Sequence, residues 1–373
     1  MEGDIKNVIT YWLDGEISNF IKVWLSIYTC LCYCYLAGKI VQKGILRFLA
    51  LFPIICLFIF LPLKLHSLHL GITTAFFVAW LSNFKLLMFV FDKGPLSDPL
   101  ISLPRFITVA CLPIKIQHKS FNENKIKDNP PHKTSKKGHK SMLNYAIKGV
   151  LLASMIKLHD YNDQIHPLVI WILYGFHIYF ALEIILAIVA TVARVSLGVE
   201  LESTFNEPLL STSLQDFWGR RWNIMVSSIL HPSVYEPVHK LSEKLLGREL
   251  APLPAVLGTF IVSALMHELL FYYMGRTRPT WKASLFFLLH GACLVVEIIT
   301  KKVVKNRWQL PRLLATVLVV GFVMVTGLVL FLPEMLRTNA DLRAFEEYAA
   351  VGAFVRDVSR ALGFAPLANA TRI

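Results

Sequence analysis

The chain has 373 residues, of which 55% are hydrophobic and only 17% are charged, whereas roughly 25% of the residues in an ordinary soluble domain are charged. Its mean hydropathy is +0.54. So little polar surface cannot cover so much apolar mass, which excludes a disordered chain, a nucleic-acid-binding domain and a soluble globular core. The composition predicts a chain that is surrounded mainly by lipid.

The net charge of +13 is unevenly distributed along the chain. From Lys115 to Lys148, nine lysines and two acidic residues contribute 9 − 2 = +7 of this charge. Basic clusters beside apolar segments follow the positive-inside rule and can also face anionic lipid. We interpret this stretch as a solvated cytosolic loop, with specific binding of lipid headgroups as the alternative.

A membrane-spanning helix needs roughly 20 mostly apolar residues, and seven stretches of the chain meet this requirement. An eighth stretch, Leu143 to Leu158, is shorter, and Lys148 and Lys157 near its ends can reach the two interfaces. It is either a short span or an amphipathic surface helix. The predicted fold class is therefore an all-α, multi-pass integral membrane protein with seven to eight transmembrane helices. The seven clear segments are residues 20–42, 44–62, 68–91, 166–195, 252–275, 282–300 and 311–333.

Counting eight crossings places all the basic segments on one side of the membrane, which is then the cytosolic side. With seven crossings, the last basic segment falls on the opposite side. We therefore expect the N-terminus and the tail after Pro333 to lie in the lumen, and we find no cleavable signal peptide at the start of the chain. The basic segments are Lys39–Arg47, Lys115–Lys140, Arg220–Arg221 and Lys301–Arg312.

Residues 1–373 are predicted to form a single membrane-embedded domain. Residues 118–140 are rich in lysine and contain Pro130-Pro131, which predicts a disordered basic loop. Residues 334–373 mix apolar residues with both charges and are predicted to form an amphipathic tail on the membrane surface. The six cysteines have no metal-ligand or disulfide spacing, so we expect neither a metal nor a disulfide framework.

Three predicted spans carry ionisable residues, which are costly in hydrocarbon unless they face a cavity or a partner. His267 and His290 lie in two spans joined by a short loop, and each is 11.5 residues from the midpoint of that loop. Their equal depth allows them to face one chamber, and Ser263 lies one helical turn before His267 on the same face. Buried histidines more often pack than catalyse, so depth alone does not assign a role. The ionisable residues are His177, Glu183, His267, Glu268, His290 and Glu297.

The segment STSLQDFWGRRWNIM lies between the fourth and fifth clear spans. Trp218 and Trp222 share a helix face, which is typical of an interfacial aromatic belt. Arg220 and Arg221 supply planar donor groups suited to phosphates. Asn223 is an amide that can either fix a histidine or polarise a carbonyl group.

The sequence FWGRRWN, followed by SALMHELLFYY with His267 44 residues after Asn223, resembles the plant wax synthase branch of the membrane-bound O-acyltransferases. The segments LSNFKLLMFVFDKGPLS, LPIKI and ARVSLGVELESTFNEPLLSTSLQD are also similar to this branch, so the resemblance runs from roughly the first span to the last. The pattern does not separate wax synthases from relatives that acylate sterols or diacylglycerol. Residues 193–300 form the catalytic motif region.

The resemblance implies acyl-CoA-dependent esterification in the endoplasmic reticulum membrane, with His267 as the catalytic base and Asn223 as its partner. The partners expected are acyl-CoA, a lipophilic alcohol and membrane lipids, without nucleic acid; the oligomeric state is left open. The residues expected to bind substrate are Arg220, Arg221, Trp218, Trp222, Ser263 and His290.

The chemistry requires no cofactor beyond acyl-CoA as co-substrate, because a thioester is already activated. A neutral imidazole in a chamber of low dielectric constant can accept the proton of an alcohol, and an amide can stabilise the oxyanion or hold the imidazole tautomer. We expect a long-chain fatty alcohol as acceptor, with a sterol or diacylglycerol as the alternative. The alternative from another class is a multi-pass transporter, but a transporter predicts repeat symmetry in the sequence, which we do not detect. The third hypothesis is a non-catalytic membrane scaffold.

Overall fold

The computed structural model describes residues 13–112, 142–158, 161, 164–197, 204–304 and 310–362. It divides into a larger unit, Met1–Pro113 with Phe205–Ile373, and a smaller unit, Ile114–Thr204. The motif region 193–300 therefore begins in the smaller unit, and the predicted basic loop 118–140 lies outside the described residues.

Seven helices of the described chain are long and apolar enough to cross a membrane, which confirms the seven segments predicted from hydropathy. The eighth candidate is the helix α7 (Met142–Leu158), whose 17 residues are short for a span. The seven helices are Gly15–Ile40, Ile45–Lys64, Leu68–Val90, Pro167–Val195, Pro252–Gly275, Lys282–Val303 and Arg312–Arg337.

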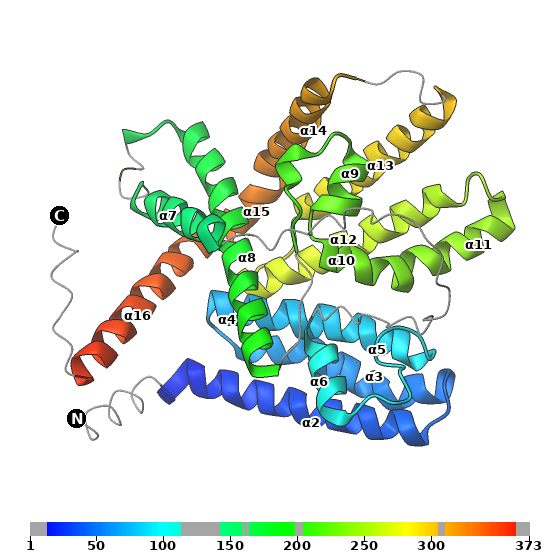
Figure 1. Ribbon diagram of the computed structural model, residues 1–373, viewed down its shortest axis with the longest axis horizontal. Helices are drawn as coiled ribbons and strands as arrows, with labels where there is room; N and C mark the ends of the chain where they lie inside the picture. Colours follow the sequence, from blue (N-terminus) through cyan, green and yellow to red (C-terminus); the bar gives the residue numbers. More distant parts are fainter. Residues whose placement is uncertain are drawn as a thin grey trace, which may run out of the picture. The chain divides into compact units, whose positions relative to one another are not determined.

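The N-terminal part of the larger unit is a group of helices drawn in blue and cyan in Figure 1. Its most buried span is Leu68–Val90, which is built from α4, η3 and α5 in succession. The middle piece, η3, is π-helical, and π-helical turns often occur at functional sites. The elements are η1 (Leu13–Ile17), α2 (Ser18–Ile40), α3 (Ile45–Phe60), η2 (Leu61–Lys64), α4 (Leu68–Thr74), η3 (Ala75–Ser82), α5 (Asn83–Val90) and α6 (Leu103–Cys111).

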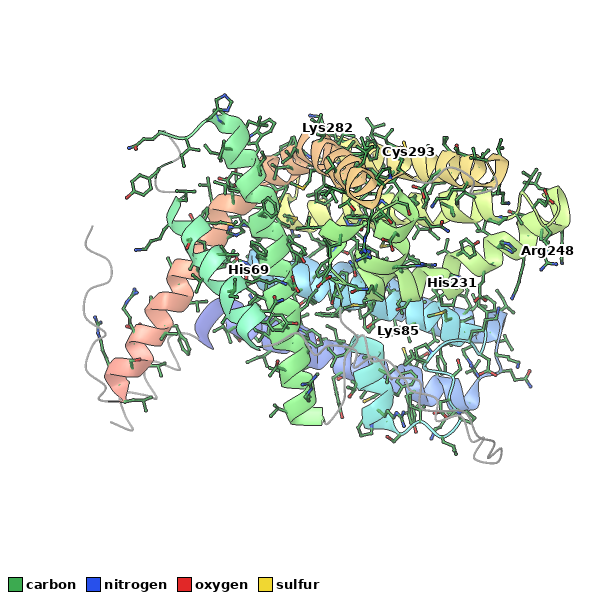
Figure 2. The ribbon with its side chains drawn as sticks, turned by 45° about the horizontal axis from the view of Figure 1, so that its top comes forward. His69, Lys85, His231, Arg248, Lys282 and Cys293 are labelled. Carbon is green, nitrogen blue, oxygen red and sulfur yellow. The ribbon has the colours of Figure 1, made fainter. Side chains whose placement is uncertain are left out.

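Lys85 lies buried in this group, with only 2% of its surface exposed (Figure 2). Its Nζ donates hydrogen bonds to the carbonyl oxygens of Val109 at 2.6 Å and Leu112 at 2.7 Å, at the C-terminal end of α6. Ser82 Oγ donates to the carbonyl of Ala110 at 2.8 Å. Because the last carbonyls of a helix lack partners within the helix and carry partial negative charge, the buried lysine satisfies them and fastens α6 to α5.

The C-terminal part of the larger unit is organised around the antiparallel hairpin of α12 (Pro252–Gly275) and α13 (Lys282–Val303) (Figure 1). Gly291 allows the two helices to approach closely, since a Cβ atom at that position would lie 2.9 Å from Cβ of Phe260. The other elements are η5 (Pro208–Leu210), α9 (Leu214–Asp216), η6 (Phe217–Arg221), α10 (Ile224–Leu230), η7 (His231–Tyr235), α11 (Glu236–Leu246), α14 (Arg312–Thr326), η8 (Gly327–Phe331), α15 (Leu332–Arg337) and α16 (Ala340–Ala361).

The predicted tail 334–373 begins in α15 and continues as α16, which packs on α4. The side-chain carboxylate of Glu347 accepts hydrogen bonds from the main-chain amides of Leu68 and His69 and from Nδ1 of His69, the last at 2.7 Å. A carboxylate at the N-terminus of α4 also complements the positive end of the helix dipole. The residues 363–373 lie outside the described part of the chain.

The smaller unit contains α7 and α8 (Pro167–Leu197), which pack against each other. Lys148 in α7 forms an ion pair with Glu183 in α8 at 2.7 Å, and Glu183 is 4% exposed. A buried carboxylate therefore compensates the charge of Lys148. The expectation that Lys148 reaches a membrane interface stays a prediction.

Candidate active site

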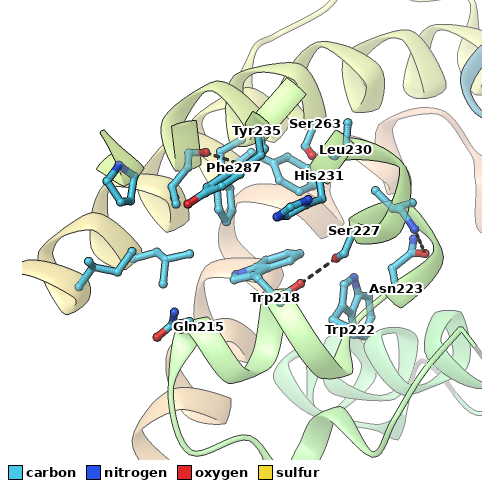
Figure 3. Close-up of a pocket in the computed structure, with 18 of the residues that line it drawn as sticks. Gln215, Trp218, Trp222, Asn223, Ser227, Leu230, His231, Tyr235, Ser263 and Phe287 are labelled. Carbon is cyan, nitrogen blue, oxygen red and sulfur yellow. Dashed lines mark hydrogen bonds between the residues drawn. The ribbon is translucent and has the colours of Figure 1, made fainter. Parts of the chain in front are cut away.

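A cavity of about 900 Å³ lies in the larger unit between α12, α13 and the segment that runs from α9 to η7. One face of α12 lines it from Pro252 to His267, and one face of α13 lines it from Phe287 to Lys302. Fifteen residues of α-helix, 267 − 252, rise about 22 Å, so the cavity is elongated along the hairpin. Figure 3 shows the lining side chains gathered around it.

His267 lies at one end of this cavity and is half-buried. Its Nδ1 is 2.7 Å from the carbonyl oxygen of Ser263, one turn earlier in α12. A carbonyl oxygen can only accept, so Nδ1 carries the proton and Nε2 of the neutral ring is left with its lone pair. Within the described residues Nε2 makes no hydrogen bond, and the ring is therefore set up to accept a proton.

Aromatic rings surround the imidazole of His267. The ring of Phe287 packs over it with centroids 4.2 Å apart and an angle of 30° between the ring planes. Trp80 from η3 and Phe331 from η8 meet it edge-on at 5.5 Å and 5.7 Å. These rings restrict the access of water to the imidazole.

Beyond His267 the interior is filled by a cluster of buried apolar side chains, against which Phe331 also packs. The cluster joins the last turns of α12 to α4, to the start of α13 and to α16, so His267 marks the inner end of the cavity. Its members are Leu68, Phe271, Met274, Ala283, Ala340 and Ala344.

Asn223 also lines the cavity and stands at the N-terminus of α10. Its backbone has the left-handed conformation with φ 42°, which asparagine tolerates better than most residues. Its Oδ1 accepts a hydrogen bond from the amide of Val226 at 3.3 Å and so caps the helix. Within the described residues, Nδ2 makes no hydrogen bond. The tautomer of His267 is held by Ser263 and not by Asn223.

The motif segment is fastened to α13 by Glu297. The carboxylate of Glu297 accepts from the amide of Leu214 at 2.7 Å and from Nζ of Lys301 at 2.7 Å. It thereby caps the short helix α9, together with Ser213, whose Oγ accepts from the amide of Asp216. This arrangement brings the following π-helical turn, η6, onto the cavity.

The predicted tryptophans and Ser263 all line the cavity (Figure 3). Trp218 packs edge-on against Phe260 with centroids 5.6 Å apart, about midway along the lining face of α12. Trp222 stacks on Phe217 at 5.4 Å with an angle of 14°. The two indoles are therefore walls of the cavity.

His290 is brought to the same depth as His267 but does not line the cavity. It is fully buried, with 0% exposed surface. Phe286 and Phe287 lie between the two imidazoles, because Phe286 packs on His290 at 4.2 Å and Phe287 packs on His267 at 4.2 Å. The expectation that both histidines face one chamber is wrong, because His267 lines the cavity whereas His290 is buried outside its lining.

The arginine pair is placed away from the cavity lining. Nε of Arg221 donates to Oδ2 of Asp216 at 2.6 Å, and Nη1 donates to the carbonyl oxygens of Asn206 and Glu207, both at 3.3 Å. The guanidinium group of Arg221 is therefore committed to the fold of the motif loop. Arg220 is exposed. Neither arginine lines the cavity, and the expectation that they bind substrate stays a prediction.

The comparisons with known proteins agree with this geometry. Residues 201–289, which contain Asn223 and His267, match the model of the membrane bound O-acyl transferase family. The chain is 48% identical to "Acyl-CoA--sterol O-acyltransferase 1" of Arabidopsis thaliana, over 93% of this chain and 99% of the relative. It is 43% identical to the "Long-chain-alcohol O-fatty-acyltransferase" of Simmondsia chinensis, over 90% and 95%, and 40% identical to "Probable long-chain-alcohol O-fatty-acyltransferase 1" of Arabidopsis thaliana, over 90% and 96%.

The chain belongs to the wax synthase branch of the membrane-bound O-acyltransferases. It is a multi-pass membrane acyltransferase, as the apolar helices and the motifs predicted. The residues matched by the family model include Asn223 and His267, which both line the cavity.

Other cavity residues of this acyltransferase were missed from the sequence. Lys301 and Lys302 line the end opposite His267, although the sequence analysis uses them only as part of the basic segment Lys301–Arg312. The spacing 287, 294, 298 and 301 follows one face of α13, and this signal could have placed the lysines on the cavity. Trp80 lies 187 residues before His267, and no spacing argument could have paired them.

Proposed function

We propose that this chain transfers a fatty acyl group from acyl-CoA to the hydroxyl group of a long-chain alcohol, in the endoplasmic reticulum membrane. The observation that carries the proposal is the free Nε2 of His267 at the inner end of a cavity that also contains the amide of Asn223 and ends in two lysines. A base, an oxyanion donor and a cationic mouth are the groups that acyl transfer from a thioester of CoA requires.

In the proposed reaction, Nε2 of His267 accepts the proton of the alcohol while its oxygen attacks the thioester carbonyl. The negative charge that develops on the carbonyl oxygen is stabilised by Nδ2 of Asn223. Collapse of the tetrahedral intermediate forms the ester and breaks the carbon–sulfur bond, and the imidazolium returns its proton to the thiolate of CoA. General base catalysis of this kind contributes about 10²- to 10⁴-fold in rate.

The acyl-CoA molecule is proposed to lie along the cavity, with its thioester at His267 and its phosphates at the opposite, cytosolic end. There, Nζ of Lys301 is anchored by Glu297, and Nζ of Lys302 donates to the carbonyl oxygen of Glu249 at 2.6 Å. Both ammonium groups are close to solvent, where they attract phosphate without the cost of complete desolvation. These lysines replace the arginine pair as the expected phosphate ligands.

A sterol is the second candidate acceptor. It is favoured by the 48% identity to a protein named for sterol acylation, whereas a long-chain alcohol appears in the names of the relatives that are 43% and 40% identical. Both acceptors present a single hydroxyl group on a large apolar body. Next to His267 the cavity is lined by the apolar side chains of Trp80 and Phe287, which either acceptor would contact.

The deciding experiment supplies membranes containing the protein with labelled acyl-CoA and an equimolar mixture of fatty alcohols, sterols and diacylglycerols, and identifies the esters by mass spectrometry. Wax esters that are absent from membranes carrying His267→Ala support the proposal. Sterol esters in their place assign the second candidate. Absence of every ester, with correctly inserted protein, contradicts the proposed function and favours the transporter.

A further inference from the structure

His290 is a buried histidine whose two ring nitrogens are both engaged. Nε1 of Trp218 lies 3.1 Å from Nδ1 of His290, and Nε2 of His290 lies 2.8 Å from Oγ1 of Thr326. The hydroxyl of Thr326 donates in turn to the carbonyl oxygen of Phe322 at 2.7 Å. The chain of hydrogen bonds therefore crosses from η6 through α13 to α14.

Donor chemistry fixes the direction of this chain. An indole N–H can only donate, so Nδ1 of His290 is the acceptor and the proton of the neutral ring is on Nε2. The hydroxyl of Thr326 gives its proton to a carbonyl and accepts from His290. With both nitrogens occupied and no exposed surface, His290 is not available to exchange a proton with substrate.

The indole that His290 holds forms the cavity wall about midway along its length. Trp218 packs on Phe260, which lies seven residues from His267 along α12, or about 10 Å. Phe287, which Trp218 also contacts with centroids 5.9 Å apart, packs on His267 itself. Any acyl-CoA that extends from Lys301 to His267 must pass the Trp218 indole.

We propose that His290 is a positioning residue. It holds the Trp218 indole in the cavity wall, midway along the cavity, and thereby determines the width of the passage through which the thioester reaches His267. The proposal rests on the proposed function, because the passage matters only if acyl-CoA uses it. Thr326 completes the arrangement by holding the His290 ring in the required tautomer.

The test is a double-mutant cycle in the purified full chain, with His290→Leu and Trp218→Phe, measured as ester formation at varied acyl-CoA and varied alcohol. His290→Leu removes both hydrogen bonds, and Trp218→Phe keeps a ring but removes the donor. We expect His290→Leu to raise the KM for acyl-CoA about ten-fold, leave the KM for the alcohol within two-fold, and add little to Trp218→Phe, since coupled residues are not additive. If the fold-change in the acyl-CoA KM of the double variant equals the product of the two single fold-changes, the residues act independently and the proposal is overturned.

His290→Gln provides the rescue, because its amide can accept from Trp218 and donate to Thr326. We expect it to restore the acyl-CoA KM to within three-fold of the native value, whereas a His290→Gln variant without ester formation overturns the proposal in favour of a catalytic base. Thr326→Val should have an intermediate effect, and Thr316→Val in the same helix is the matched control without an effect. Lower protein yield with unchanged kinetic constants also overturns the proposal.

A separate measurement distinguishes failure of this proposal from failure of the proposed function. If the native chain forms no ester, the same cycle is measured as equilibrium binding of labelled acyl-CoA in the His267→Ala background. Weaker binding by His290→Leu that is not additive with Trp218→Phe supports the positioning role. Unchanged binding, or binding losses that are additive, overturns it.

Discussion

At the scale of single residues, each of the two motif residues is held by a local hydrogen bond. The carbonyl of Ser263 fixes the tautomer of His267 within α12, and the side-chain oxygen of Asn223 caps α10. The sequence alone left two roles open for Asn223. The cap holds the oxygen in place, and the proposed function uses the donor hydrogens of Nδ2.

Asn223→Asp separates the cap from the catalytic role. Aspartate keeps an oxygen that can accept from the amide of Val226 and is an equally good helix cap, but it replaces the donor with a negative charge. We expect normal insertion and thermal stability with a loss of about 10²- to 10³-fold in kcat, the usual cost of removing an oxyanion donor. Activity within five-fold of the native value would show that the cap is the only role of Asn223.

Lys301→Gln combined with Lys302→Gln tests the cationic end of the cavity. Because charge-assisted hydrogen bonds to a remote part of the substrate are lost, the KM for acyl-CoA should rise about ten-fold while the KM for the alcohol stays unchanged. Arg220→Gln, which removes an exposed charge outside the cavity lining, is the matched control and should change neither constant. A larger effect of Arg220→Gln than of the lysine pair would restore the arginine as the phosphate ligand.

That His267 and Asn223 line one cavity agrees with the motifs that resemble a known family, and their catalytic roles stay a prediction. The function of the arginines could not be predicted from the sequence, because an arginine that binds phosphate and an arginine that stabilises a loop look the same there. What distinguishes Arg221 is Asp216 five residues earlier, which a π-helical turn brings within 2.6 Å. The unusual turn has no signal in the hydrophobic pattern.

At the scale of secondary-structure elements, the α12–α13 hairpin determines the width of the cavity. Glu268 accepts from the amide and the hydroxyl of Ser284, both at 3.0 Å, at the start of α13. Gly291 lies against Phe260 two turns further on. These contacts fix the register that places Phe287 over His267.

Gly291→Ala should disturb this register. The new Cβ would lie 2.9 Å from atoms of Phe260, so the helices must separate, at a cost of about 1–3 kcal/mol for overpacking. We expect a lower melting temperature in detergent and a lower kcat. Gly321→Ala in α14 is the control, because nothing lies within 4 Å of its Cβ; it should be neutral or slightly stabilising. Equal melting temperatures for the two variants would contradict the packing argument.

The attachment of α16 to α4 should depend on pH through Glu347. Burial raises the pKa of Glu347, but hydrogen bonds from the His69 side chain and from the amides of His69 and Leu68 outweigh burial and lower the pKa below its ordinary value of 4.5. A lowered pKa stabilises the folded state above the unfolded pKa, and this stabilisation is lost as the pH falls through the folded value.

We therefore expect the melting temperature to fall between pH 5 and pH 3 in the native protein and to fall less steeply in Glu347→Gln, which keeps an oxygen acceptor but does not titrate. The measurement is thermal unfolding in detergent as a function of pH. Glu346→Gln, at an adjacent and more exposed position, is the control and should follow the native curve. Parallel curves for the native protein and Glu347→Gln would contradict the assignment.

Hydropathy was sufficient to predict the seven long helices, because a run of about 20 apolar residues has few alternatives to spanning a membrane. It was not sufficient for α7, whose 17 residues contain Lys148. The partner of that lysine, Glu183, is 35 residues away. A contact at such a separation is set by tertiary packing, which the local pattern does not record.

At the scale of the whole molecule, the residues that line the cavity all come from the larger unit. The predicted basic loop 118–140 lies outside the described residues, and its role as a linker stays a prediction.

Deletion of residues 122–137 should leave most of the ester formation, because the two ends of the stretch remain connected and the cavity is not touched. The measurement is ester formation per amount of inserted protein. A deletion of the same length within α12 is the control and should abolish activity. Complete loss in the loop deletion, with normal insertion, would show that the basic stretch takes part in substrate binding.

The apolar cluster beyond His267 has a consequence for where the two products go. Since Leu68, Phe271 and Met274 fill the molecule past the reacting atoms, neither product can continue through the protein to the far side. Under the proposed function, CoA dissolves in water, while each methylene group of the ester gains about 0.8 kcal/mol by staying in an apolar medium. The enzyme would then act at a phase boundary, and the separation of its products into two solvents would oppose the reverse reaction without any moving gate.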